Sequence, residues 1–151
     1  MIKFITGDIF ETTMPAIGHG VNTQSDMSGG IARAIKAMFP DVWLPYVQAC
    51  QLGELVPGWF LPVEVRSEPS LLILNLASQE KPGADARLEW LEESMANAIS
   101  YAELTGLEGF AVPRIGAGIG GLDWETEVKP LMEKLAAETD VLIEVWSQPD
   151  A

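Results

Sequence analysis

The fold is decided by the stretch Val112-Pro113-Arg114-Ile115-Gly116-Ala117-Gly118-Ile119-Gly120-Gly121-Leu122-Asp123-Trp124. An apolar run that begins at Phe110 leads into four glycines within six residues, and a helical pattern follows. Glycine permits positive φ and lets backbone N–H groups approach a ligand closely. A strand, a glycine loop and a helix N-terminus in this order form an anion site, because unpaired amides and the helix dipole point the same way. We therefore expect a phosphate or pyrophosphate here; the alternative is a tight turn that needs glycine for its own geometry.

Length and composition indicate a single domain over residues 1–151 and, we expect, a monomer. The chain has 151 residues, of which 48% are hydrophobic, and this is enough to bury a core. Its formal net charge of −13 repels a nucleic-acid backbone, so we expect no general nucleic-acid binding. A small anionic ligand remains compatible with this charge, because backbone amides can hold it without side-chain cations.

The few metal-binding and redox residues limit what the chain can bind. Cys50 is the only cysteine, which excludes an intrachain disulfide and indicates a reducing cytoplasm. With His19 as the only histidine, we expect no metal site. The start of the chain is too short and too soon interrupted to be a signal peptide, and uncharged stretches such as residues 69–79 are too short to cross a membrane. We expect a cytoplasmic protein without a membrane partner.

Strands and helices are expected to alternate along the chain. The expected strands cover residues 2–5, 15–21, 59–65, 71–76, 110–112 and 141–146. The first expected helix is capped by Ser28 and carries Ile31, Ala34, Ile35 and Met38 on one face, and the second covers residues 41–52. The third begins at its N-cap Asp85 and ends at Gly106, and the fourth follows the glycine loop with Pro130 in its first turn. The continuous apolar run over residues 71–76 predicts a strand buried on both faces. This order predicts a layered α/β fold with a mixed, mostly parallel sheet and a ligand site beyond the carboxyl ends of its strands.

One pattern within the glycine loop suggests a different ligand. Gly116-x-Gly118-x-x-Gly121 formally matches the dinucleotide fingerprint, and Glu144 lies on the next strand, where an acid could bind a ribose. Only one strand follows the match, which is too little chain for a doubly wound nicotinamide domain. We therefore treat a nicotinamide dinucleotide as a minor hypothesis.

Four motifs in order carry a resemblance to a known family. They are Gly7-Asp8-Ile9 after the first strand, Gly20-Val21-Asn22 after the second, Ser28-Gly29-Gly30-Ile31-Ala32 at the first helix, and Pro113 to Gly121. Together they resemble a macrodomain over residues 1 to about 146. The last loop, followed by Leu122-Asp123-Trp124, is most similar to the branch of terminal ADP-ribose glycohydrolases and bacterial DNA ADP-ribosyl glycohydrolase antitoxins. The resemblance implies a three-layer α/β/α fold and a pocket for ADP-ribose, with no other cofactor.

The resemblance also implies which residues bind the ligand. Asp8 matches the acid that accepts a hydrogen bond from the adenine amine, although an Asp after glycine is also a common turn residue. Asn22 matches the amide that orients the distal ribose, although Asn also suits turns. Two facing sets of backbone amides would hold the diphosphate. The full expected set is Asp8, Ile9, Asn22, Ser28, Gly29, Gly30, Ile31, Arg114, Ile115, Gly116, Ala117, Gly118, Ile119, Gly120 and Gly121.

Other conspicuous residues have a plain structural interpretation beside a functional one. His19, on a strand of small residues, is expected to be a core histidine rather than a base. Arg114 either steers a phosphate or pairs with a surface acid, and Trp124 either walls the pocket or joins the core. The acidic group of Glu89, Glu92 and Glu93 is expected to be a solvated helix face.

The catalytic residues of the family are replaced in this chain. In the glycohydrolase branch a lysine attacks the anomeric carbon and an aspartate helps to resolve the adduct; Gln79 and Gly120 stand at those positions. Ala32 stands where the other hydrolytic branch has its aspartate. A glutamine amide is no such nucleophile, and we expect Lys81, two residues on, to be a surface residue. The catalytic candidates that remain are Asn22 and Gln79, which could position a water against the distal ribose.

Three hypotheses about function follow. The first is an enzyme that binds ADP-ribose and hydrolyses ADP-ribose 1″-phosphate or an ADP-ribosylated protein or nucleobase. The second is a non-catalytic reader or scavenger of ADP-ribose. The third is a nicotinamide-dinucleotide protein, which predicts that NAD binds more tightly than ADP-ribose.

Overall fold

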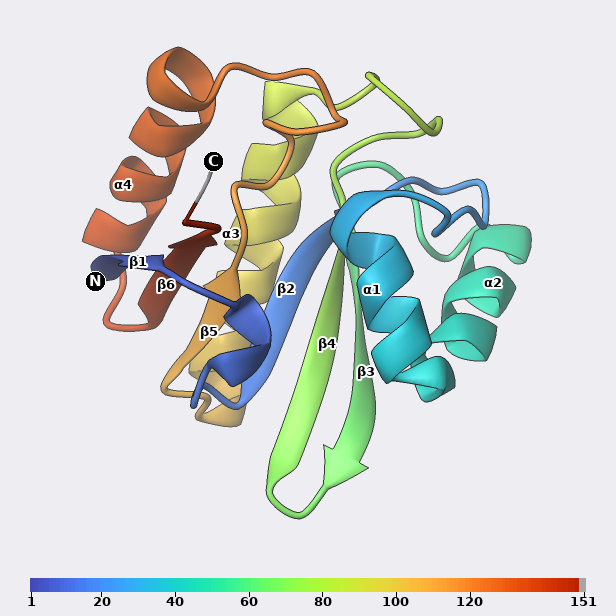
Figure 1. Cartoon of the computed structure of the whole chain (residues 1–151), viewed down its shortest axis with the longest axis horizontal. Helices are drawn as coiled ribbons and strands as arrows, with labels where there is room; N and C mark the ends of the chain where they lie inside the picture. The colour runs from blue at the N-terminus through green and yellow to red at the C-terminus, as the bar shows by residue number, and fades with distance from the viewer. Residues whose placement is uncertain (150–151) are drawn as a thin grey trace.

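The computed structural model describes residues 1–149 and contains the expected alternation of strands and helices (Figure 1). The strands are β1 (Ile2–Thr6), β2 (Ala16–Val21), β3 (Phe60–Ser67), β4 (Ser70–Ala77), β5 (Gly109–Val112) and β6 (Leu142–Ser147). The α-helices are α1 (Gly30–Met38), α2 (Trp43–Gln51), α3 (Leu88–Thr105) and α4 (Lys129–Ala137). Short helical turns cover η1 (Ile9–Glu11), η2 (Pro40–Val42) and η3 (Trp124–Val128). Each predicted strand and helix is present, with ends shifted by a few residues.

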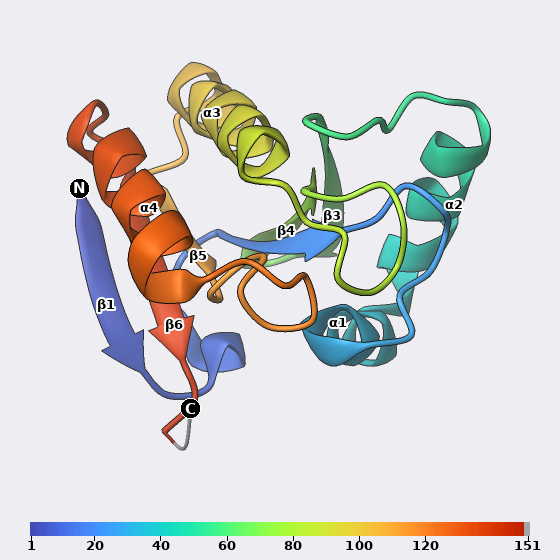
Figure 2. The same ribbon diagram turned by 90° about the horizontal axis from the view of Figure 1, so that it is seen from above.

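The six strands form one mixed sheet in the order β1-β6-β5-β2-β4-β3. Every neighbouring pair is parallel except β3 and β4, which are antiparallel. Helices α3 and α4 pack on one face, and α1 and α2 cover the other (Figures 1 and 2). The predicted three-layer α/β/α fold with a mostly parallel sheet is confirmed.

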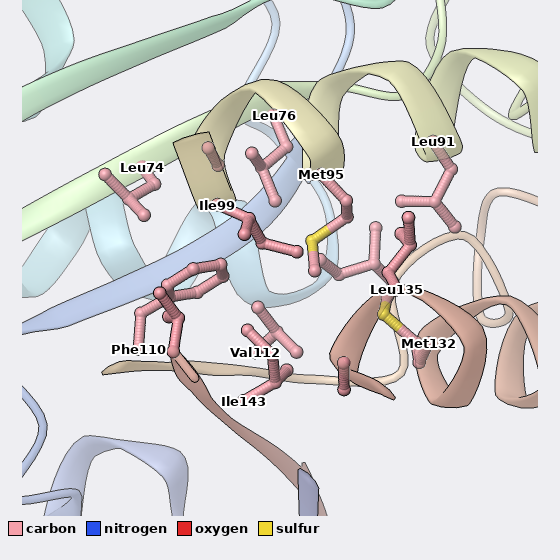
Figure 3. Close-up of a cluster of buried hydrophobic side chains, with 14 of the residues drawn as sticks. Leu74, Leu76, Leu91, Met95, Ile99, Phe110, Val112, Met132, Leu135 and Ile143 are labelled. Atoms are coloured by element: carbon pink, nitrogen blue, oxygen red, sulfur yellow. The ribbon is translucent and has the colours of Figure 1, made fainter. Parts of the chain in front are cut away.

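Strand β4 shows why the core has two halves. Its apolar side chains alternate between the faces, so that Leu74 and Leu76 join the cluster under α3 and α4, whereas Leu71 and Ile73 pack toward α1 and α2. Figure 3 shows the first of these clusters, where Met95 from α3 reaches toward the sheet. Burying each side chain of this size contributes roughly 1.5–3 kcal/mol. The strand is therefore buried on both faces, as the continuous apolar run predicts.

Strand β2 has little side-chain volume because its neighbours lie close. A Cβ atom at Gly18 would lie 3.1 Å from Val112 Cγ1 and 3.3 Å from Leu76 Cδ1. A Cβ at Gly20 would lie 2.7 Å from Ser78 Oγ. These glycines let side chains of β4 and β5 fill the space above β2.

Three local predictions are wrong. Ser28 does not cap α1: Gly29 is the N-cap, and Ser28 instead hydrogen-bonds the Asp26 carboxylate through its side chain and through its N–H, the latter at 2.8 Å. Asp85 does not cap α3, which starts after Arg87; its carboxylate instead accepts the N–H groups of residues 80 and 81. Met38 is 51% exposed, since α1 ends at this residue. Pro130 does lie in the first turn of α4, as predicted.

No helix within residues 1–149 is long and apolar enough to cross a membrane.

Candidate functional site

Two cavities adjoin at the carboxyl ends of the central strands. We call the first the Ser78 cavity; it has a volume of about 410 Å³ and lies between the N-terminus of α1, the loop after β4 and the glycine loop. The second, the Asp8 cavity, has about 860 Å³ and lies between the loop after β1, α1 and the end of β6. Both are lined by Gly30, Ile31, Pro113 and Arg114. An elongated ligand can therefore occupy both.

Most of the predicted ligand-binding residues line these cavities. The Ser78 cavity contains Asn22, Ser28, Gly29, Gly30, Ile31, Arg114, Ile115, Gly116, Gly118, Ile119 and Gly120 from that set, together with Gln79. The Asp8 cavity contains Asp8 and Ile9. Two predicted residues do not line either cavity: Ala117 packs against the core under α3, and a Cβ at Gly121 would face Ala84.

The glycine loop presents only some of its amides to the cavity. The N–H groups of Ile115, Ala117 and Gly121 donate to carbonyls within the loop. Among residues 1–149, no protein acceptor is found for the N–H groups of four others: Gly116, Gly118, Ile119 and Gly120. All four line the Ser78 cavity. Unpaired backbone amides beside a cavity are available to an anionic ligand.

A second set of donors comes from the start of α1. Helix geometry leaves its first N–H groups without an intrahelical acceptor, and the helix dipole adds partial positive charge there. The two segments lie close together, since Ile119 Cδ1 would lie 3.1 Å from a Cβ at Gly29 and 3.2 Å from one at Gly30, and all three residues line the Ser78 cavity. The pair of facing loops expected from the sequence is therefore present.

The glycines of the loop have different reasons to be glycine. Gly116 and Gly121 have φ of 79° and 89°, which side-chain-bearing residues rarely adopt. Gly120 is needed for packing, because its Cβ would lie 2.8 Å from Ala86 Cβ and 2.8 Å from the Gly116 carbonyl oxygen. Gly118 has neither reason: its φ is not positive, and nothing lies within 4 Å of its Cβ position. Gly118 thus lines the cavity at a place where the fold itself does not require glycine.

Asn22 organises the loop that follows β2. Its Oδ1 accepts from Gln24 N, Asp26 N and the Tyr46 hydroxyl, and its Nδ2 donates to Asp26 O at 2.8 Å. Tyr46 is fully buried on α2, and its single hydroxyl proton is shared between Asn22 O at 2.7 Å and Asn22 Oδ1 at 3.0 Å. Burial raises the pKa of this hydroxyl. An amide group has two N–H donors, so Asn22 keeps one for a ligand while holding the loop.

Gln79 closes the loop after β4. Its Nε2 donates to the carbonyls of Lys81 and Gly83, and the Asp85 carboxylate caps the same loop. Ala86 N donates to Gly120 O at 3.1 Å, which ties this loop to the glycine loop. Lys81 is exposed, as predicted, and does not line either cavity. The Gln79 side chain thus shapes the cavity wall through its amide.

Two polar residues of the Ser78 cavity were missed by the sequence analysis. Asp26 is the one acidic side chain in its described lining, and hydrogen bonds from Ser28 lower the pKa of its carboxyl group. Ser78 is 1% exposed, and its Oγ has no hydrogen-bond partner within residues 1–149. The only signal in the sequence is that Ser78 directly follows a wholly apolar strand end.

The Asp8 cavity ends at an aromatic wall that was also missed. Asp8 Oδ1 accepts from Phe10 N at 3.0 Å, so the carboxylate caps η1 and still borders the cavity. Trp146 lines the cavity from the end of β6, and its Nε1 donates to Glu144 Oε1 at 3.0 Å. Glu144 also accepts from Thr12 Oγ1 and lines neither cavity. It therefore fixes an indole and does not have the position that a ribose-binding acid of a nicotinamide site would need.

His19 is a core residue, as predicted. It is fully buried, and its Nε2 lies 2.7 Å from Asn75 Oδ1 on the neighbouring strand. Burial lowers the pKa of His19 to about 4, although the Asn75 contact opposes this shift. The ring is therefore neutral at pH 7, and it borders neither cavity.

Arg114 lies where the two cavities meet. Its guanidinium stacks on the Trp124 ring at 4.9 Å, and Trp124 packs against the core cluster rather than lining a cavity. In the described part of the chain, the one ion pair joins Lys134 and Glu92. Arg114 is therefore an uncompensated cation at the junction of the cavities, where an anion would lie. Within residues 1–149, the pairing of Arg114 with a surface acid is not found.

Comparison with known proteins identifies the family. The Macro domain family model matches residues 18–131, and the chain belongs to this family. It is 30% identical over 148 residues to a DNA ADP-ribosyl glycohydrolase of Thermus aquaticus, covering 97% of this chain and 40% of that protein. It is 28% identical over 146 residues to an ADP-ribose 1″-phosphate phosphatase of Candida albicans, covering 88% of this chain and 93% of that protein. Its fold is similar to the macrodomain of Mycobacterium tuberculosis DarG, with a TM-score of 0.90, 26% identity and 97% of each chain covered. The chain spans about 40% of the length of the DNA ADP-ribosyl glycohydrolases it matches.

Proposed function

We propose that this macrodomain binds ADP-ribose across both cavities and hydrolyses a small ADP-ribose derivative or an ADP-ribosyl linkage. The observation that carries the proposal is the row of unpartnered amides at Gly116, Gly118, Ile119 and Gly120, facing the start of α1. A diphosphate fits between two sets of backbone donors, and Arg114 adds a cation at the same place. This explains how a chain of net charge −13 can bind an anion.

The polar groups in the two cavities indicate which end of ADP-ribose lies in which cavity. Asp8 can accept the adenine amine in the larger cavity, and the Trp146 indole offers a flat surface to the base. The distal ribose then lies in the Ser78 cavity, beside Asn22 and Gln79. The names of the relatives agree with this choice, since they include both an ADP-ribosyl glycohydrolase and an ADP-ribose 1″-phosphate phosphatase.

The proposed hydrolysis does not use a covalent lysine adduct. Gln79 holds the loop in shape, and Asn22 orients the distal ribose with its remaining N–H. Asp26 is the carboxylate in the described lining that can accept a proton from an attacking water. Its lowered pKa makes it a weak base, so most of the rate enhancement would come from positioning the water and the ribose.

A second candidate function is a non-catalytic reader of ADP-ribose. It is favoured by the tie between Ala86 N and Gly120 O and by the absence of space for a side chain at Gly120. An aspartate at that position would force the two loops apart. On the resemblance described above, Gln79 and Gly120 stand where the glycohydrolase branch has its lysine and aspartate, and in this chain both residues shape the loops.

Two measurements separate these functions. Isothermal titration should show ADP-ribose binding more tightly than ADP or NAD, because ADP lacks the distal ribose and NAD carries a nicotinamide on it. Mass spectrometry should then detect turnover of ADP-ribose 1″-phosphate, ADP-ribosylated thymidine or ADP-ribosylated glutamate. Asp26→Asn, which keeps an acceptor for Ser28 N, should lower turnover about ten-fold or more without weakening ADP-ribose binding. Tight binding without turnover of any of the three would favour the reader.

A further inference from the structure

One buried carboxylate has no part in the proposed binding of ADP-ribose. Glu144 lies on β6, is 7% exposed, and is the one acidic residue among the buried residues of the described chain. The one ion pair within residues 1–149 joins Lys134 and Glu92, so no cation compensates Glu144 there. Burying an acid without a cation is unfavourable, and Glu144 borders neither cavity. Its presence therefore points to a role that it has through its neighbours.

The neighbours of Glu144 are two hydrogen-bond donors. Thr12 Oγ1 donates to Glu144 Oε1 at 2.7 Å, and Trp146 Nε1 donates to the same oxygen at 3.0 Å. An indole N–H can only donate, so this contact fixes which way the ring of Trp146 is turned. The six-membered ring of the indole lies against the chain at Gly7, where a Cβ would be 3.3 Å from Trp146 Cζ3. The indole is therefore held at both of its edges, and it lines the Asp8 cavity.

We propose that Glu144 is a positioning residue for adenine recognition, which holds the Trp146 indole in the orientation that presents its flat face to the base. This inference rests on the proposed function, which puts the adenine in the Asp8 cavity. Stacking of a base on an aromatic side chain depends on how the two rings are oriented. An indole that is free to turn about its side-chain bonds would lose part of this contact. The affinity for every adenine-bearing ligand then depends on an acid that does not touch the ligand.

Two substitutions of similar size separate the hydrogen bonds of Glu144 from its charge and volume. Glu144→Gln keeps an oxygen that can accept from both donors, whereas Glu144→Leu fills the space without an acceptor. By isothermal titration, Glu144→Leu should weaken ADP and ADP-ribose by the same factor, about three- to ten-fold, because both ligands carry the adenine. Glu144→Gln should bind both ligands within about two-fold of the wild type.

A third variant tests whether Glu144 acts through the indole. Trp146→Phe keeps an aromatic ring but has no N–H for Glu144, so it should weaken both ligands, and adding Glu144→Leu to it should change either affinity by less than about two-fold. It also tests the inference if Glu144→Leu alone fails to fold. Val145→Ala is the matched control for a defect in β6, because Val145 is buried in the cluster under α3 and α4 and lines neither cavity. It should lower the melting temperature and leave both affinities unchanged.

The outcomes are distinguishable. If the wild-type chain binds ADP-ribose and either Glu144→Leu or Trp146→Phe binds both ligands equally well, the role of Glu144 is wrong and the proposed function stands. Equal weakening by Glu144→Gln and Glu144→Leu would also overturn that role, because the acceptor would then not matter. So would weaker binding of ADP-ribose alone, since the defect would then lie away from the adenine. Failure of the wild-type chain to bind ADP-ribose would overturn the proposed function and this inference together.

Discussion

Gly118 offers a clean perturbation of the phosphate site. Its backbone φ is ordinary, and nothing lies within 4 Å of its Cβ position, so a side chain at this cavity-lining residue meets open space and no protein atom. We predict that Gly118→Glu folds with wild-type stability, within about 1 kcal/mol, because the fold does not require glycine at this position. The same variant should lose ADP-ribose binding.

The size of this loss can be estimated from charge alone. A carboxylate about 5 Å from one phosphate charge, at an effective dielectric constant of about 20, repels it by about 3 kcal/mol. This is a reduction of more than 100-fold in affinity, before the steric effect of the side chain is counted. Gly118→Gln, which has the same size without the charge, should lose less.

Isothermal titration with ADP-ribose and thermal unfolding of the same samples measure the two effects. Gly120→Ala supplies the opposite control, since its Cβ would lie 2.8 Å from Ala86 Cβ and from the Gly116 carbonyl oxygen. That variant should lose stability as well as affinity. If Gly118→Glu is folded and binds ADP-ribose as the wild type does, the glycine loop does not hold the diphosphate.

Three further predictions follow from single contacts. Asp8→Ala should weaken ADP-ribose binding about ten-fold or more by titration. Asp8→Asn keeps the cap on Phe10 N, so weak binding by both variants assigns the loss to the adenine contact of the carboxylate. Normal binding by both variants would contradict that contact. Tyr46→Phe should lower the free energy of unfolding by about 1–3 kcal/mol in urea, because Asn22 O loses its buried donor; an unchanged value would mean that water replaces it. His19, with its pKa lowered to about 4, stays neutral while the unfolded chain takes up a proton below its ordinary 6.5. Its contribution to stability is therefore complete above about pH 7 and falls by roughly 2 kcal/mol at pH 5, and His19→Gln should reduce this loss in urea unfolding at the two pH values.

The order of the strands and helices could be predicted because each is marked locally. The apolar run that became β4 and the helical spacing that became α3 depend only on which face of the element is buried. The caps could not be predicted so well. Ser28 and Asp85 are both good capping types, but the side chain of each is engaged in a local turn, Ser28 with Asp26 and Asp85 with Lys81 N.

The loops that border the candidate site could be predicted from the sequence, whereas several other residues that line the two cavities could not. The glycine motifs predict two facing loops, and the structure contains them. The contact between Ala86 and Gly120 joins segments far apart in sequence, and nothing in either loop marks the other as its neighbour. Ser78 and Trp146 face cavities only because of where β4 and β6 end in the sheet, which sequence spacing does not reveal.

A crystal structure of the chain with ADP-ribose tests most directly whether the two cavities form one binding groove. The account predicts the adenine beside Asp8 and Trp146, the diphosphate against the amides of Gly116 to Gly120, and the distal ribose in the Ser78 cavity beside Asn22 and Gln79. A ligand confined to one cavity, or bound with its adenine in the Ser78 cavity, would contradict it.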